Sequence, residues 1–143
     1  MKDEQGKGDV KPPRSSSFSP HPSSLPLDLK TRTREFALRV ITLCTDVPNT
    51  AAGQVIAKQL LRSGTSVGAQ YREGCRARSD AEFVSKLDGA LQELEESEYW
   101  MELLVESGLA DADRMRPLMS EADELAAILV TCVKKVKARK RKG

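Results

Sequence analysis

The segment 79-SDAEFVSKLDGALQELEESEYWMELLVESG-108 predicts one long amphipathic helix with both of its ends marked. Ser79 and Glu82 have the spacing of a capping box, in which the hydroxyl and the carboxylate each accept a hydrogen bond from a free backbone N–H of the first turn. Gly108 is a typical C-terminal cap, because glycine adopts left-handed backbone angles without strain. Between these ends, apolar residues recur every three or four positions, as in a helix that buries one face. They are Phe83, Leu87, Ala90, Leu91, Leu94, Met101, Leu104 and Val105.

Three other segments show the same helical spacing of apolar residues. The first is expected over about 29–47 and ends before Pro48. The second starts at position 49 or 50 and carries apolar residues as far as Tyr71. The last starts near 111 or 113, holds Pro117 near its start and runs to 138. The apolar positions are Phe36, Val40, Leu43, Cys44 and Val47 in the first, Val55, Ile56, Leu60, Val67 and Tyr71 in the second, and Leu118, Ala122, Leu125, Ile128, Leu129, Cys132, Val133 and Val136 in the last.

These four segments predict an all-α protein, an antiparallel up-down four-helix bundle over residues 29–138. Residues 1–28 are rich in Pro and Ser and are predicted to be a disordered tail. Residues 139–143 are expected to be a basic C-terminal tail that frays into solvent. His21, the only histidine of the chain, lies in the first tail and is expected to be solvated rather than catalytic.

The composition is that of a soluble single-domain protein, with 143 residues, 39% of them hydrophobic and 31% charged. Cys44, Cys75 and Cys132 are far apart, form no CxxC pair and have no histidine nearby, so neither a zinc site nor a disulfide framework is indicated. The start of the chain lacks the apolar region of a secretory signal, and no apolar run has membrane-spanning length. We expect a cytoplasmic protein without cofactor or metal.

Charge is distributed in blocks, although the net charge is only +2. The charged residues among 79–113 are almost all acidic, whereas the last ten residues, KKVKARKRKG, are mostly Lys and Arg. Such basic clusters are candidates for phosphate contact, and solvation alone is the alternative. The candidate nucleic-acid contacts are Arg72, Arg76 and Arg78 between the second and third helices, and Lys134, Lys135, Lys137, Arg139, Lys140, Arg141 and Lys142 at the end of the fourth. We expect these two clusters at opposite ends of the bundle.

The glycines of SVGAQYREGCRARSDAEF, residues 66–83, do not form a phosphate-binding loop, because no Lys follows them and the pattern is helical. Small residues at 63, 64, 66 and 68 instead favour a close approach of two helix backbones. Cys75 lies among arginines that could lower its pKa, but no histidine outside the tail could act as its base. We therefore interpret this stretch as a corner between helices and not as an active site.

Several charged residues lie beside the apolar stripes of the second and third helices. Glutamates of a bundle can hold a di-iron site, but that site needs Glu-x-x-His on two helices, and the bundle segment contains no histidine. A structural network of ion pairs and hydrogen bonds is the more plausible role. Its expected members are Gln59, Arg62, Glu73, Glu93 and Glu96.

Tyr99 and Trp100 interrupt an otherwise acidic face of the third helix. Large aromatic side chains on the outside of a bundle often mark a contact surface. Self-association through these two residues is the preferred interpretation, and burial in the core is the alternative.

With the helices laid out, the order of motifs becomes informative: QLLRSGTSVGAQYREG (59–74), SDAEFVSKL (79–87) and LQELEESEYWMELL (91–104). Together they resemble the four-helix-bundle proteins first noticed as products of intervening sequences inside bacterial large-subunit ribosomal RNA genes. The resemblance implies an up-down bundle that assembles as a ring of five and has no known enzymatic activity. The accessory proteins of diversity-generating retroelements, which bind nucleic acid and a reverse transcriptase, are similar in architecture.

Two functions follow as hypotheses. In the first, a non-enzymatic homo-oligomer, expected to be a pentamer, contacts RNA or DNA through phosphates, without base readout because no aromatic residues are interleaved with the basic ones. In the second, the bundle is a protein-interaction scaffold, or an accessory subunit for a partner such as a reverse transcriptase, and binds no nucleic acid. An enzyme is the least favoured interpretation, and no membrane contact is expected.

Overall fold

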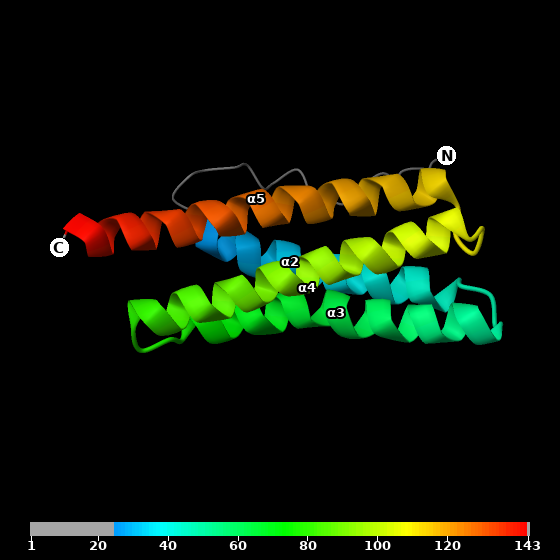
Figure 1. Cartoon of the computed structure of the whole chain (residues 1–143), viewed down its shortest axis with the longest axis horizontal. Helices are drawn as coiled ribbons and strands as arrows, with labels where there is room; N and C mark the ends of the chain where they lie inside the picture. Colours follow the sequence, from blue (N-terminus) through cyan, green and yellow to red (C-terminus); the bar gives the residue numbers. More distant parts are fainter. Residues whose placement is uncertain (1–24, 143) are drawn as a thin grey trace, which may run out of the picture.

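The structure is a computed structural model that describes the backbone of residues 25–142 and the side chains of residues 29–139, and this part of the chain forms four helices. They are α2 (Leu25–Thr45), α3 (Ala51–Cys75), α4 (Asp80–Glu106) and α5 (Ala112–Lys142). Each helix runs antiparallel to the one before it, so α2 and α4 begin where α3 and α5 end (Figure 1). The predicted all-α, four-helix architecture is confirmed.

Two helix bounds differ from expectation. The first helix begins at Leu25, so residues 25–28 belong to α2, and Pro26 is accommodated because the N–H groups of a first turn have no partner within the helix. The last helix continues through Lys142 instead of ending at Ala138, since Lys and Arg are good helix formers and cations are favourable at a helix C-terminus. The rest of the predicted disordered tail, with His21, lies outside the described residues.

The N-terminal caps of α3 and α4 follow the sequence signals. The Ser79 hydroxyl accepts a hydrogen bond from the Glu82 N–H at 3.1 Å. The Glu82 carboxylate accepts a hydrogen bond at 3.1 Å from the N–H of Arg78, the residue before Ser79. The capping box therefore includes part of the α3–α4 link, residues 76–79. Thr50 caps α3 by accepting from the Gly53 N–H at 3.0 Å. Both helices therefore start where short polar side chains satisfy free backbone donors.

Gly108 ends α4 as predicted, with a φ of +79° that favours glycine. Its N–H donates to the carbonyl of Val105 at 3.0 Å, and the N–H of Leu109 donates to the carbonyl of Leu104 at 2.9 Å. These two bonds form a Schellman motif, which turns the chain toward α5 while satisfying carbonyls of the last turn.

The core is aliphatic and contains the inward faces of all four helices. Its largest fully buried side chains are Phe36, Leu29, Leu60, Leu87, Leu94, Met101, Leu104, Met115, Leu125, Leu129, Val40 and Val67. One predicted core position is wrong: Val55 is 62% exposed, because it lies on the outer face of the first turns of α3. None of the described helices combines the length and the apolar character needed to cross a membrane.

The small residues of α3 let α2 approach closely. A Cβ added at Gly64 would lie 2.9 Å from a methyl group of Val40, and one at Gly68 would lie 3.1 Å from the hydroxyl of Thr33. Both distances are shorter than ordinary packing allows, so a larger residue at either position would force its neighbour on α2 to shift. The close-packing interpretation of this segment is confirmed.

Candidate nucleic-acid interface

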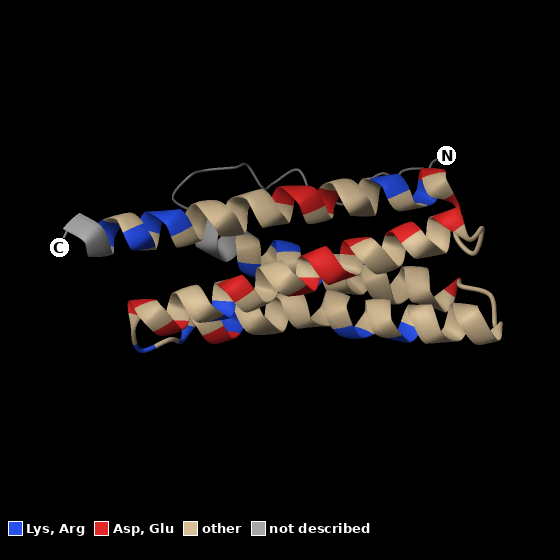
Figure 2. Cartoon of the chain, in the orientation of Figure 1, with Lys and Arg blue, Asp and Glu red and all other residues tan. Residues whose placement is uncertain are grey.

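The two basic clusters lie at the same end of the bundle, which corrects the expectation that they are separated. The α3–α4 link joins the end of α3 to the start of α4, and α5 runs antiparallel to α4 and so ends beside that start (Figure 1). Figure 2 shows the Lys and Arg residues of the link and of the last turns of α5 at this one end. At this end the Arg139 guanidinium near the end of α5 lies 3.7 Å from the carboxylate of Asp80, the first residue of α4. Two antiparallel helices, α4 and α5, follow the link, so the chain returns to the same end of the bundle when α5 ends.

Every predicted contact residue whose side chain is described is exposed at this end. We call this group the basic end: Arg72, Arg76, Arg78, Lys134, Lys135, Lys137 and Arg139. Lys140, Arg141 and Lys142 continue the same helix, and their side chains lie outside the described residues. Val133 and Val136 anchor α5 in the core between these cations. The basic end is therefore carried by two rigid helices and the short link between α3 and α4.

A notch of about 380 Å³ separates the link from α5. Arg78 stands on its link side and Arg139 on its α5 side, while Phe83 and Val136 line it from α4 and α5. The remaining lining residues are Gly74, Cys75, Ala77, Ser79 and Asp80. Gly74 permits the close approach here, since a Cβ on it would lie 2.7 Å from a methyl group of Leu87. The notch is thus a hollow with a guanidinium group on each side.

Three carboxylates also lie at this end, and the charges there are partly paired. Asp80 faces Arg139, and the Glu82 carboxylate accepts from the backbone of the link. Glu73 pairs with Lys86 at 2.8 Å, and this hydrogen bond raises the pKa of Lys86. The exposed guanidinium and ammonium groups outnumber these carboxylates, so the end stays positive. Asp80 was not singled out from sequence, although acidic residues are common in a first helical turn.

Two of the three thiols, those of Cys44 and Cys132, are half-buried in the packing between helices. Burial raises the pKa of Cys44 to about 11, and its Sγ donates to the carbonyl of Ala57 at 3.3 Å. Burial also raises the pKa of Cys132. Cys75 is exposed. The pKa of Tyr71 beside it is raised, mainly by burial and also by a hydrogen bond with the Cys75 thiol. Cys44 and Cys132 therefore remain protonated at neutral pH. Among the described residues, no group of three His, Cys, Asp or Glu side chains could hold a metal ion.

The expected polar network between α3 and α4 divides into two parts. Arg62 pairs with Glu96 and, at 3.4 Å, with Glu93. The indole N–H of Trp100 also donates to Glu96 at 3.0 Å, and these bonds, that of Arg62 first, lower the pKa of Glu96. The pair of Glu73 and Lys86 described above is separate from this group. Gln59 is half-buried and forms no hydrogen bond with Arg62 in the part of the chain that the structure describes.

Trp100 and Tyr99 differ in their surroundings. Trp100 is half-buried against the core, and its indole N–H is bonded as described above. Tyr99 is 52% exposed, and its ring centroid lies 5.0 Å from that of Trp100. The predicted interface role of the two residues stays a prediction, with Tyr99 as the member that is available for contact.

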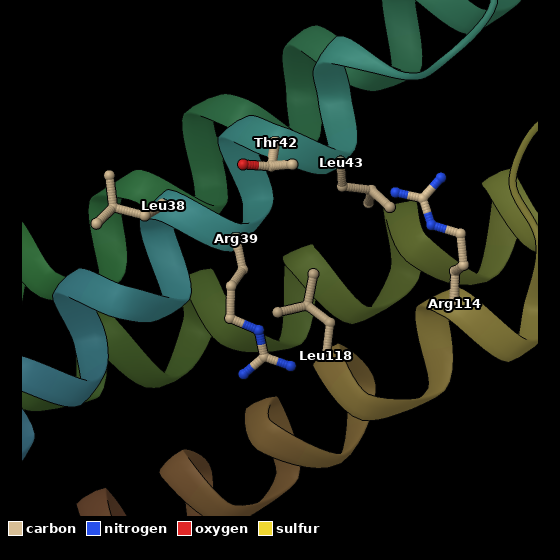
Figure 3. Close-up of a pocket in the computed structure, with 6 residues that line it drawn as sticks. All are labelled: Leu38, Arg39, Thr42, Leu43, Arg114 and Leu118. Carbon is tan, nitrogen blue, oxygen red and sulfur yellow. The ribbon is translucent and has the colours of Figure 1, made fainter. Parts of the chain in front are cut away.

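A second hollow, of about 280 Å³, lies between α2 and α5 (Figure 3). Arg39 reaches from α2 beside Leu118, and Arg114 reaches from α5 toward Leu43. Arg114 is bound to Asp46 at 2.8 Å. The hollow is lined by Leu38, Arg39, Thr42, Leu43, Arg114 and Leu118. This groove combines leucine side chains with two guanidinium groups.

Two carboxyl groups face each other between α4 and α5. Glu98 forms a hydrogen bond with Asp123, and its pKa is raised to about 7 by partial burial, by that bond and by the negative charges of Asp123, Glu102 and Glu95. Sequence reasoning missed this pair. The available signal was the row of glutamates at 95, 98 and 102, which places like charges on one helix face.

Comparisons with known proteins agree with this architecture. A model of the 23S rRNA-intervening sequence protein family matches residues 26–131. The crystal structure of a protein with unknown function from the S23 ribosomal protein family, from Bacteroides thetaiotaomicron, is 37% identical to this chain. That match covers 74% of this chain and 98% of the other, with a TM-score of 0.70. A search of the curated proteins finds no match. The family match includes the cations of the α3–α4 link and stops before Lys134.

Proposed function

The chain belongs to the 23S rRNA-intervening sequence protein family, and on that basis we propose that it is a non-enzymatic, homo-oligomeric four-helix-bundle protein that binds nucleic acid through phosphates. The observation that supports this most is the junction of two basic clusters into one basic end. Seven exposed cations on a rigid frame can displace the counterions of a nucleic acid without reading bases.

The shape of the basic end supports phosphate contact over simple solvation. Arg78 and Arg139 stand on the two sides of the notch, so an anion between them meets positive charge from both. Arginine is suited to this role because its planar guanidinium presents several N–H donors to phosphate oxygens. The other cations of the basic end widen the positive surface around the notch, as a backbone of many phosphates requires.

Self-association strengthens the proposal, because several copies bring several basic ends to one nucleic acid. Linked sites bind more tightly than one site, since each later contact forms within the same complex. The exposed Tyr99 supports a contact between copies. A homopentamer is the assembly we propose, in line with the ring of five that the sequence resemblance implies. The free thiols are consistent with the proposed cytoplasmic location.

A protein-interaction scaffold is the second candidate function, favoured by the groove between α2 and α5. Leu38 on its edge is 49% exposed, which leaves apolar surface for a partner. In this role the bundle is an accessory subunit, with a reverse transcriptase among the candidate partners.

Three matched variants test the proposed function, each removing three positive charges. The corner variant carries Arg72→Gln, Arg76→Gln and Arg78→Gln, and the α5 variant carries Lys134→Gln, Lys135→Gln and Lys137→Gln. The control variant carries Arg39→Gln, Lys58→Gln and Arg116→Gln, all exposed and toward the other end. Binding of short mixed-sequence RNA and DNA is measured at about 50 mM and about 200 mM salt.

We expect the wild type and the control variant to bind at the lower salt, to weaken at the higher salt, and to bind more tightly than the other two variants. An absence of binding by the wild type at the lower salt contradicts the proposal. Equal affinity of all four proteins places the contact elsewhere and contradicts the assigned surface.

A further inference from the structure

We infer that the nucleic acid held by the basic end is a duplex and not a single strand, an inference that rests on the proposed function and specifies its substrate. It depends on three features of this end: the lack of exposed aromatic rings among its described residues, the rigidity of the elements that carry the cations, and the projection of α5 past the notch.

No described aromatic side chain at the basic end is available for a base to stack on. Tyr71 is only 3% exposed, and Phe83 is half-buried in the wall of the notch. The exposed ring of Tyr99 lies nineteen residues along α4 from Asp80, which is roughly 28 Å along the helix axis at the usual rise per residue. Proteins that hold single strands normally gain much of their affinity from stacking on such rings. This surface offers charge without stacking.

A single strand loses conformational freedom when it binds to fixed charges. Base stacking usually compensates that loss, and the described residues of the basic end offer no exposed ring for it. A duplex is already ordered, and its two backbones carry twice as many charges along the axis as one strand carries. Each cation of the basic end therefore meets more phosphates on a duplex, and a duplex loses less conformational entropy on binding than a single strand does.

The backbone segments that carry these cations are held in fixed positions. Arg72 lies in the last turn of α3, and the capping bonds of Ser79 and Glu82 fix the link that carries Arg76 and Arg78. On the other side of the notch, Val136 and the contact of Arg139 with Asp80 fix the path of α5. A fixed array of charges matches a regular helical phosphate pattern better than a flexible one.

The helix α5 also extends past the notch. Arg139 is the last described residue that lines the notch, and the helix continues three residues further to Lys142, a length of about 4.5 Å. Figure 1 shows this end projecting beyond the α3–α4 link. One sugar–phosphate backbone can lie in the notch between Arg78 and Arg139, and the end of α5 then extends toward the second strand of a duplex. A single strand offers no such second row.

The test compares one labelled RNA duplex with each of its two separated strands, chosen to lack self-complementarity, at the same salt concentration. A DNA duplex of the same sequence and its strands form the second arm. We expect both duplexes to bind at least about tenfold more tightly than their strands, with a steeper dependence of affinity on salt. The corner variant should lose most of this preference, and the control variant should keep it.

Single strands that bind as tightly as the duplexes overturn the inference and leave the proposed function in place. A preference that survives in the corner variant also overturns it, because the duplex then lies elsewhere. If neither duplexes nor strands bind the wild type at low salt, both the inference and the proposed function are overturned.

Discussion

The guanidinium of Arg139 lies 3.7 Å from the carboxylate of Asp80, and this contact joins the last turns of α5 to the first residue of α4. Both side chains are largely exposed, at 66% and 46%, so the pair adds little to stability. Its importance is positional, because it brings the charge of the C-terminal helix to the α3–α4 link. Asp80 is also a negative group on the rim of the notch.

Replacing that carboxylate should strengthen nucleic-acid binding. In Asp80→Asn, Arg139 no longer faces a negative charge and is free for phosphate, so we expect affinity for a duplex to rise several-fold at low salt. The free energy of unfolding should change by less than about 1 kcal/mol, because an exposed residue in a first turn contributes only modestly. Anisotropy titration and urea unfolding measure the two quantities. A weaker affinity in this variant contradicts the placement of the phosphate beside Arg139.

Two glycine substitutions should have opposite effects on stability. Gly64→Ala places a methyl group 2.9 Å from Val40 across the α2–α3 contact, so we expect a loss of about 1–3 kcal/mol. Gly89→Ala meets only the amide end of the Gln70 side chain, which can move aside, so the better helix propensity of alanine should stabilise by up to about 1 kcal/mol. Urea unfolding checks both. Adding Val40→Ala to Gly64→Ala is the control, and this second change should relieve the clash at the cost of lost apolar contact.

The hydroxyls of Ser63 and Ser97 are predicted to be energetically coupled. They are buried and lie 2.8 Å apart between α3 and α4, and Ser97 also donates to the carbonyl of Glu93 at 2.9 Å. Each single change to alanine should destabilise the fold by about 1–3 kcal/mol, since it removes a partner from a buried polar group. The double variant should lose less than the sum, which a double-mutant cycle measures. Strict additivity would show that the two hydroxyls do not interact.

The pair of Glu98 and Asp123 gives the stability a pH dependence. Because the pKa of Glu98 is raised from 4.5 to about 7, the folded state holds this proton more tightly than the unfolded state. The contribution of Glu98 to stability is therefore greatest below 4.5 and falls as the pH rises to about 7. Glu98→Gln keeps a donor for Asp123 and carries no charge, so it should be more stable than the wild type at about pH 8 and lose this advantage near pH 5. Urea unfolding at the two pH values tests this, and a difference that does not change with pH contradicts it.

The caps and stripes of this fold could be predicted because their signals are local. The spacing of Ser79 and Glu82 fixed the start of α4, and Gly108 marked its end. Val55 was misplaced because the second turn of α3 carries it on the outer face, and an apolar residue there does not change the spacing that follows. The buried pair of Ser63 and Ser97 was missed because serine gives no apolar signal, and burial of its hydroxyl depends on a partner from another helix.

For the candidate site, the basic clusters could be predicted from the sequence, but their position relative to each other could not. The exposed cations were identified correctly as clusters, because runs of Lys and Arg are visible in one dimension. Whether the two clusters meet depends on the direction of each helix. The prediction that they lie at opposite ends is wrong, because α5 runs back to the end at which α4 begins. The counter-charge of Asp80 and the notch follow from that position, so neither had a sequence signal of its own.

The central claim is that the two basic clusters act as one surface, and the salt dependence of duplex binding tests it most directly. The slope of log affinity against log salt is measured for the wild type, for the corner, α5 and control variants, and for the corner and α5 changes combined. Each lost phosphate contact should reduce the slope by about 0.9. We predict a reduced slope for the corner variant and for the α5 variant, a still smaller slope for the combination, and an unchanged slope for the control. A wild-type slope in either of the first two variants would contradict the claim, because one cluster would then bind without the other.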